Sequence, residues 1–155
     1  FFYYDKKEYT KKLFIALIGN LIGTFAIAML MRQTRFGPAL IEQAQLKTAV
    51  KLGDSPLSLF ILAFFCNMFV NNAVHQFKYN RYQVGKYLAI FVSIMTFALS
   101  GFEHSIADSF FFFLAGDFNL LALRNFFIII IGNILGGLVI PSLALMYDDT
   151  FSIAG

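Results

Sequence analysis

The sequence predicts an all-α membrane protein, built as a helical bundle in which one helix is broken. Only 14% of its 155 residues are charged and 59% are hydrophobic, whereas soluble globular domains carry nearer 25% charged residues. The mean hydropathy is +0.71. A crossing helix needs about 20 apolar residues, so a chain of this length holds four or five crossings at most.

Four spans are predicted, and polar segments separate them. The first three cover residues 13–31, 56–77 and 87–114, and the last covers residues 126–147. Each is long enough to cross the hydrocarbon core of a bilayer. Residues 32–55 are polar, and we interpret them as an extramembrane connection that contains a short helix.

The third span is predicted to break near Gly101. Its first apolar run, Tyr87 to Leu99, has only thirteen residues, which is too short to cross a bilayer alone. The polar segment that follows carries Glu103 and His104. Irregular backbone at membrane depth is tolerated only where it is buried in protein or lines a cavity.

Ionisable side chains gather at this predicted break. Glu103, His104 and Asp108 lie between two apolar runs, and ionisable groups inside a membrane usually mark an ion or proton pathway. The alternative is a buried polar cluster that only ties helices together. Asn67 and Asn133, inside other predicted spans, allow the same two interpretations.

Two spans share a motif, which predicts an inverted repeat. Gly19-Asn20-Leu21-Ile22-Gly23 is echoed by Gly132-Asn133-Ile134-Leu135-Gly136, in spans that run in opposite directions. Inverted repeats in transporters place discontinuous helices around a central site. We therefore expect two further spans before Phe1, one of them broken. The simpler alternative is that paired glycines only let helices approach closely.

The positive charges predict orientation rather than a nucleic-acid partner. The net charge is only +3, and the basic residues cluster between the apolar runs. The group that lies closest to the span ends is assigned to the cytoplasm by the positive-inside rule. This group consists of Lys6, Lys7, Lys11, Lys12, Lys78, Arg81 and Lys86.

The residue inventory argues against an enzyme, a metal site and a cofactor. The single Cys66 excludes a disulfide within the chain. The two histidines, His75 and His104, lie on different spans without paired ligand spacing, whereas catalytic zinc needs three protein ligands. Ser105 adjoins His104, but neighbouring side chains on a helix point apart, which disfavours a serine nucleophile.

The segment Ser100-Gly101-Phe102-Glu103-His104-Ser105-Ile106-Ala107 closely resembles the fifth-helix signature of the formate/nitrite transporter family. Cys66-Asn67-Met68-Phe69-Val70 resembles that family's fourth-helix motif, and the two Gly-Asn pairs resemble its third and sixth helices. Lys51 stands where the family carries a vestibule lysine. The resemblance covers residues 14–145.

The resemblance implies a homopentamer in which each protomer has its own pore and an aquaporin-like fold of six transmembrane helices. Four of the six would lie in residues 1–155, as a single transmembrane channel domain. The implied solutes are formate, nitrite, hydrosulfide, acetate or lactate, moving with protons through a bacterial inner (plasma) membrane. The chain departs from the family at Asp108, where Asn is usual, and at Asn71, Asn72 and His75.

A substrate pathway follows from these residues. We expect an exposed Lys51 to attract the anion, and His104 to offer it a proton, since the ordinary pKa of histidine is about 6.5. Glu103 would orient the imidazole. The remaining predicted pathway residues are the donors Asn67 and Asn133, together with Phe102 and Ser105.

Two other functions remain open at this stage. One is a structural or assembly subunit of the membrane that transports nothing. The other is a channel for ammonium or a small neutral solute, although Lys51 and the lack of a second central histidine argue against a cation path.

Overall fold

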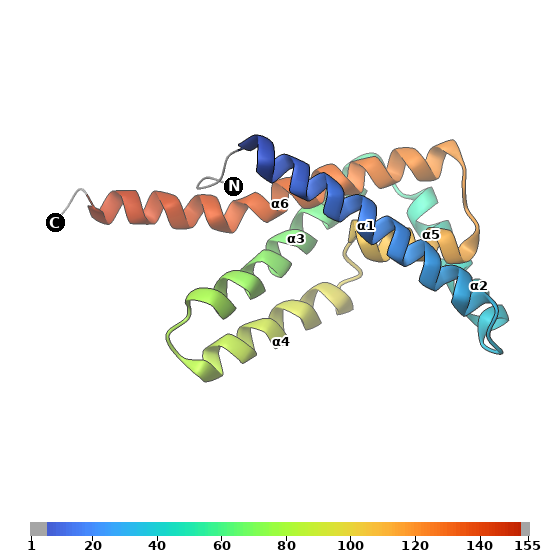
Figure 1. Cartoon of the computed structure of the whole chain (residues 1–155), viewed down its shortest axis with the longest axis horizontal. Helices are drawn as coiled ribbons and strands as arrows, with labels where there is room; N and C mark the ends of the chain where they lie inside the picture. The colour runs from blue at the N-terminus through green and yellow to red at the C-terminus, as the bar shows by residue number, and fades with distance from the viewer. Residues whose placement is uncertain (1–5, 153–155) are drawn as a thin grey trace. The chain divides into compact units, whose positions relative to one another are not determined.

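The computed structural model describes residues 6–152, which form six helices and no strands. This confirms the predicted all-α class. The helices are α1 (Lys6–Arg32), α2 (Gly37–Gly53), α3 (Pro56–Tyr79), α4 (Gln83–Leu99), α5 (Ser105–Ala115) and α6 (Leu120–Ser152) (Figure 1).

Three helices are long and apolar enough to cross a membrane. They comprise Lys7–Arg32, Pro56–Tyr79 and Leu120–Tyr147, and each contains a span that the sequence predicts. The chain is therefore a membrane protein. The predicted third span corresponds to two shorter apolar helices, α4 and α5, and their joint crossing stays a prediction.

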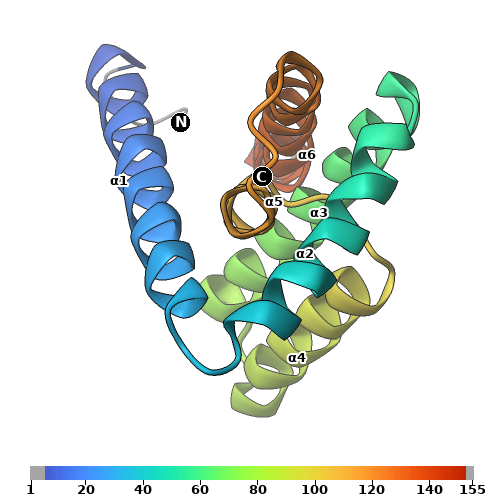
Figure 2. The same cartoon turned by 90° about the vertical axis from the view of Figure 1, so that its right-hand side faces the viewer.

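Helix α2 is longer than the short helix expected between the first two spans. It has 17 residues, rich in Ala, Leu, Gln and Lys, which favour helix without favouring a membrane. The turn from α1 requires Gly37, because a Cβ there would collide with the Arg32 carbonyl oxygen. Figure 2 shows α2 leaving the end of α1 through this turn.

The chain divides into two compact units. In the unit formed by the residues up to Gly53 and Ile106–Leu123, Ala28, Ala44 and Leu114 form a small buried core. Polar contacts secure α5 against α1. The Thr24 and Ser109 hydroxyls lie 3.0 Å apart within hydrogen-bonding distance, and the Arg32 guanidinium donates to the Leu114 carbonyl at 2.8 Å.

The other unit contains Asp54–Ser105 and the chain from Arg124 onward. Helix α3 begins where predicted, with Pro56 in its first turn and the Ser55 hydroxyl accepting from the Ser58 amide at 3.2 Å. Helices α3 and α4 pack side by side (Figure 1). The Asn72 amide, 3.2 Å from the Ser93 hydroxyl, joins them.

Glycines bring α6 against α3 in this second unit. A Cβ at Gly132 would lie 2.7 Å from the Phe60 carbonyl oxygen, and one at Gly136 would collide with the Phe64 carbonyl oxygen. Close approach of this kind is the use that membrane helices make of small residues. In α1, by contrast, Gly19 and Gly23 have nothing within 4 Å, so the inverted repeat stays a prediction.

Gly136→Ala should destabilise the protein, because the added methyl group meets the fixed backbone of α3. Overpacking of this kind costs about 1–3 kcal/mol, so we expect the melting temperature in detergent to fall by about 5 °C. Gly53→Ala is the matched control, since a Cβ there has nothing within 4 Å. Equal melting temperatures for the two variants would contradict close packing at Gly136.

Candidate functional site

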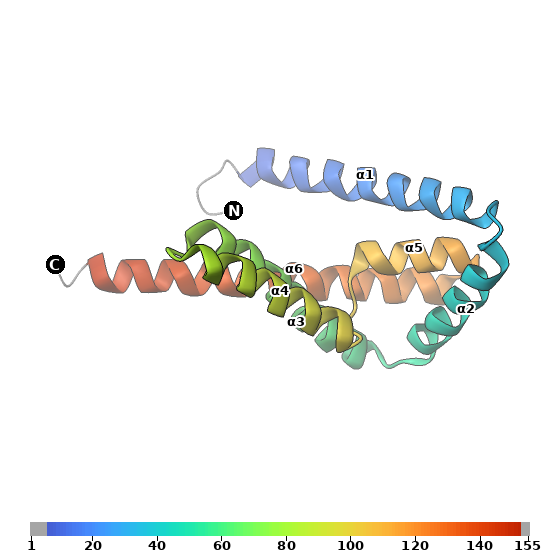
Figure 3. The same cartoon turned by 90° about the horizontal axis from the view of Figure 1, so that it is seen from below.

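The candidate site is the non-helical junction between α4 and α5. Helix α4 ends as the Ser100 amide donates to the Thr96 carbonyl at 3.0 Å, and α5 begins at Ser105. Between them Gly101 adopts a φ of 67°, a left-handed conformation that glycine takes without strain. Figure 3 shows the junction as the linker that enters α5.

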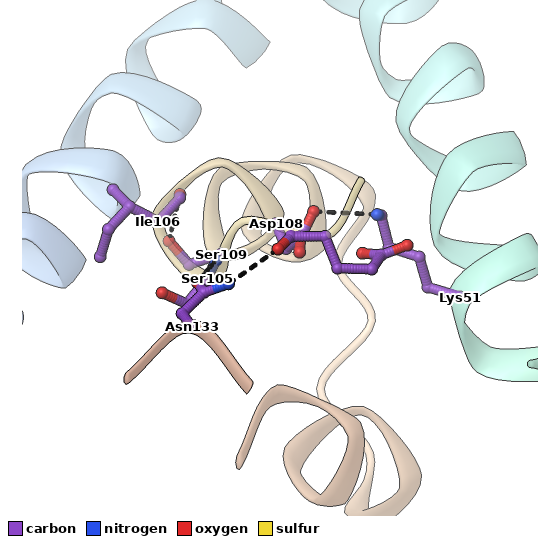
Figure 4. A network of polar contacts seen from close by, with 7 residues as sticks. Lys51, Ser105, Ile106, Asp108, Ser109 and Asn133 are labelled. Atoms are coloured by element: carbon purple, nitrogen blue, oxygen red, sulfur yellow. Dashed lines mark hydrogen bonds and ion pairs between the residues drawn. The ribbon is translucent and has the colours of Figure 1, made fainter. Parts of the chain in front are cut away.

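The side chain of Asn133, on α6, hydrogen-bonds to the main chain on both sides of His104. Its Nδ2 donates to the Glu103 carbonyl at 2.9 Å, and its Oδ1 accepts from the Ser105 amide at 2.9 Å (Figure 4). These groups belong to the two peptide planes that flank His104. One asparagine therefore fixes the backbone of the histidine.

The side-chain amide of Asn133 donates its other hydrogen to helix α3. Nδ2 also donates to the Ala63 carbonyl at 2.8 Å, so both amide hydrogens and the oxygen are engaged with main-chain atoms. A donor to a passing solute, as the sequence analysis expected of Asn133, would have to give up one of these bonds. Its place in the substrate pathway stays a prediction.

Asn67 adds a second link between α3 and the same residue. Its Nδ2 donates to the main-chain carbonyl of Asn133 at 2.6 Å. Gly137 leaves the room for this, because a Cβ there would lie 2.7 Å from that Nδ2. The structure thus brings the two predicted asparagines together, as cross-links between α3 and α6.

Aromatic rings surround the junction. Phe102 stacks on Phe65 and Phe69 of α3, with ring centroids 6.4 Å and 5.9 Å away. The ring of Phe97, on α4, lies 6.2 Å from that of the half-buried His104.

The junction thus collects six of the seven predicted pathway residues within one unit: Asn67, Phe102, Glu103, His104, Ser105 and Asn133. Of these, Glu103, Ser105 and Asn133 are buried. Sequence reasoning missed Phe65 and Phe97. The spacing of Phe65 and Phe69, one helical turn apart, was the available signal for a shared face. Across residues 7–147, no three His, Cys, Asp or Glu side chains form a metal-binding group.

The seventh predicted residue, Lys51, lies in the other unit and is not the exposed charge that we expected. Its Nζ is 2.9 Å from Oδ1 of Asp108, and the two side chains are only 11% and 4% exposed (Figure 4). The expectation was wrong because a polar sequence environment does not reveal a partner brought from a distant helix. A role for Lys51 in the pathway stays a prediction.

Neighbouring contacts hold Lys51 in place. One helical turn earlier on α2, the Thr48 hydroxyl hydrogen-bonds to the Asp117 carboxylate. The ammonium of Lys47 lies 4.4 Å from the centroid of the Phe111 ring, within the range of a cation–π interaction. Side chains of α2 thus reach α5 and the turn after it.

Asn133→Asp should destabilise the junction, because a carboxylate oxygen replaces the donor and faces the Glu103 and Ala63 carbonyls. Leaving buried polar groups unsatisfied costs about 1–3 kcal/mol each. We expect a lower melting temperature in detergent and faster proteolysis between α4 and α5. Asn71→Asp, at a half-buried position of α3 outside this network, is the control. The same loss in both variants would contradict a specific role for Asn133.

Comparison with known proteins supports the resemblance seen in the sequence. The family model described as formate/nitrite transporter matches residues 5–147, which include both the junction and the Lys51–Asp108 pair. No curated protein and no solved structure matched the chain. The chain belongs to the formate/nitrite transporter family.

Proposed function

We propose that this chain is a channel or transporter for small monovalent anions of weak acids, and that His104 links transport to protons. Membership of the family supports anion transport across a membrane rather than an enzymatic activity. The observation that carries the histidine role is that Asn133 donates a hydrogen bond to the Glu103 carbonyl and accepts one from the Ser105 amide, on the two sides of His104. Hydrogen bonds that fix the position of an ionisable residue inside a membrane protein are expected where that residue has a function.

The physical problem is the desolvation of the anion. A bare charge is expelled from surroundings made of aromatic and aliphatic side chains, and the rings of Phe97 and Phe102 provide such surroundings at the junction. A proton taken up by the anion removes the charge. Histidine suits the transfer because its ordinary pKa of about 6.5 allows it both to give and to take a proton near neutral pH.

A fixed backbone restricts what the histidine can do. With both flanking peptide groups held, the imidazole moves only through its two side-chain torsions, of which the first occupies a few staggered rotamers and the second varies more broadly. The ring can therefore return to the same position after each proton transfer. Glu103, buried and adjacent in sequence, is the residue to which we assign its orientation.

The assembly and the setting follow from the family resemblance. We propose a homopentamer in a bacterial inner membrane, in which the α4–junction–α5 segment forms one broken crossing. The candidate solutes are formate, nitrite, hydrosulfide, acetate and lactate. The Asn133 network also fits a second candidate, a membrane subunit that only assembles, because each of its hydrogen bonds ties helices together.

Replacing the histidine separates the two candidates. His104→Phe keeps an aromatic ring beside Phe97 but cannot exchange a proton, so we expect an intact oligomer and loss of acid-driven formate uptake into liposomes. His75→Phe is the matched control, because the ring of His75 lies beside that of Tyr79 within α3, with ring centroids 4.8 Å apart and the planes tilted by 45°. Wild-type uptake by His104→Phe would remove the histidine from the mechanism.

The solute preference is tested by a panel at two pH values. Liposomes with the wild-type protein should take up formate, nitrite, hydrosulfide or lactate faster at the lower external pH, because protons accompany the anion. Empty liposomes report the leak of each neutral acid. Absence of uptake above this leak for every solute would favour the assembly subunit.

A further inference from the structure

We propose that the turn between α3 and α4 binds the headgroups of anionic phospholipids. The surface concerned, which we call the basic turn, consists of Lys78, Tyr79, Arg81, Tyr82, Lys86 and Tyr87. Its cations contact the lipid phosphates, and its tyrosine rings lie beside the glycerol and the upper part of the acyl chains. The whole surface belongs to one compact unit, and binding there does not depend on the proposed transport function.

The charges of the basic turn are all positive. From Ser55 to Phe102 the sequence has no Asp or Glu. Within the part of the chain that the structure describes, none of Lys78, Arg81 and Lys86 forms an ion pair. Lys78 and Arg81 are exposed, and Lys86 is half-buried. Three cations without counter-charges in one short turn complement an anionic membrane surface.

The length of α3 places the basic turn at the level of the lipid headgroups. The helix has 24 residues, which span about 36 Å, whereas the hydrocarbon core of a bilayer is about 30 Å thick. A crossing α3 therefore carries Lys78 and Tyr79, in its last turn, out of the hydrocarbon. Figure 1 shows the basic turn at one end of the α3–α4 pair, with the junction that follows α4 at the other end.

Hydrogen bonds of Asn80 fix the shape of the turn. Its amide donates to the Gln76 carbonyl at 2.9 Å, where α3 ends. Its side chain accepts from the Tyr82 amide at 2.9 Å and donates to the side-chain oxygen of Gln76 at 3.1 Å. Gly85 leaves room for this side chain, because a Cβ there would lie 2.8 Å from Asn80 Nδ2. A backbone that is ordered before a ligand arrives lowers the entropic cost of binding.

The tyrosines favour a lipid over a soluble anion. Tyr79, Tyr82 and Tyr87 are 61%, 77% and 64% exposed, and a ring with a polar tip is typical of the level where hydrocarbon meets water. Neighbouring side chains keep two of the rings near the cations. The Lys78 ammonium lies 5.2 Å from the centroid of the Tyr79 ring, and the Tyr87 ring lies 6.2 Å from that of Phe77. A free phosphate would use the cations alone, whereas a phospholipid also uses the rings.

Native mass spectrometry of the full chain in detergent tests the inference through the apparent Kd for phosphatidylglycerol, with zwitterionic phosphatidylcholine as the reference lipid. Each basic residue near an anionic surface strengthens binding about fivefold, so Lys78→Gln/Arg81→Gln/Lys86→Gln should weaken phosphatidylglycerol binding about 100-fold. Its affinity for phosphatidylcholine should stay unchanged. The variant Lys78→Arg/Arg81→Lys/Lys86→Arg keeps the charges and should bind phosphatidylglycerol nearly as the wild type does.

A second triple variant controls for net charge. Lys11→Gln/Lys12→Gln/Arg35→Gln removes three exposed cations from other parts of the chain, and it should keep most of the affinity for phosphatidylglycerol. An equal loss in the two glutamine triples would show a diffuse effect of charge and would overturn the inference. Equal affinity of the wild type for the two lipids would overturn it as well.

Two further measurements cover a failure to assemble and a different ligand. If the triple variants at the basic turn do not fold, Arg81→Gln alone, at an exposed position, should weaken phosphatidylglycerol binding about fivefold. Unchanged affinity in that variant would contradict the proposal. Glycerol phosphate carries the anionic group without acyl chains and should not displace the bound lipid. Displacement at equal concentration would identify a site for free phosphate esters and would overturn binding of a lipid.

Discussion

The hydrogen bonds of one side chain, Asn133, make the interruption between α4 and α5 possible. Peptide groups that leave a helix lose their partners, and an apolar environment offers none in return. Asn133 supplies partners to the Glu103 carbonyl and the Ser105 amide. It reaches them because Gly132 and Gly136 let α6 approach α3 closely. The glycines, the asparagine and the junction are therefore one physical unit.

The parts of the fold that were predictable are those with a local cause. Long apolar runs fixed the three spanning helices, and Pro56 marked the start of α3. The apolar run from Tyr87 to Leu99 has only thirteen residues, which indicated that the helix would end before it had crossed the membrane. Helix α4 does end at Leu99. What joins these helices was not predictable in the same way, because the partners of Asn133 are main-chain atoms, which every residue possesses and no sequence pattern distinguishes.

Long-range contacts cannot be predicted from a local sequence pattern. For this reason the exposure of Lys51 and the length of α2 were predicted wrongly, and the two copies of the Gly-Asn motif have different surroundings. Lys51 was placed by its polar neighbours in sequence, yet its partner comes from α5. Helix α2 was underestimated because a helix outside the long apolar runs has only weak propensity signals. Asn20 and Asn133 have the same neighbours in sequence, but Asn20 is exposed and Asn133 is buried at the junction. Tertiary neighbours, rather than the motif, decide what each asparagine does.

The buried pair of Lys51 and Asp108 has a consequence for how such sequences diverge. Losing one member of a buried ion pair costs about 3–5 kcal/mol, whereas replacing both by neutral residues is often harmless. A single substitution in the pair is therefore expected to cost more stability than a double one. Positions 51 and 108 should therefore change together among descendants of this sequence. Where the carboxylate at position 108 has been lost, other residues around the lysine should have changed as well.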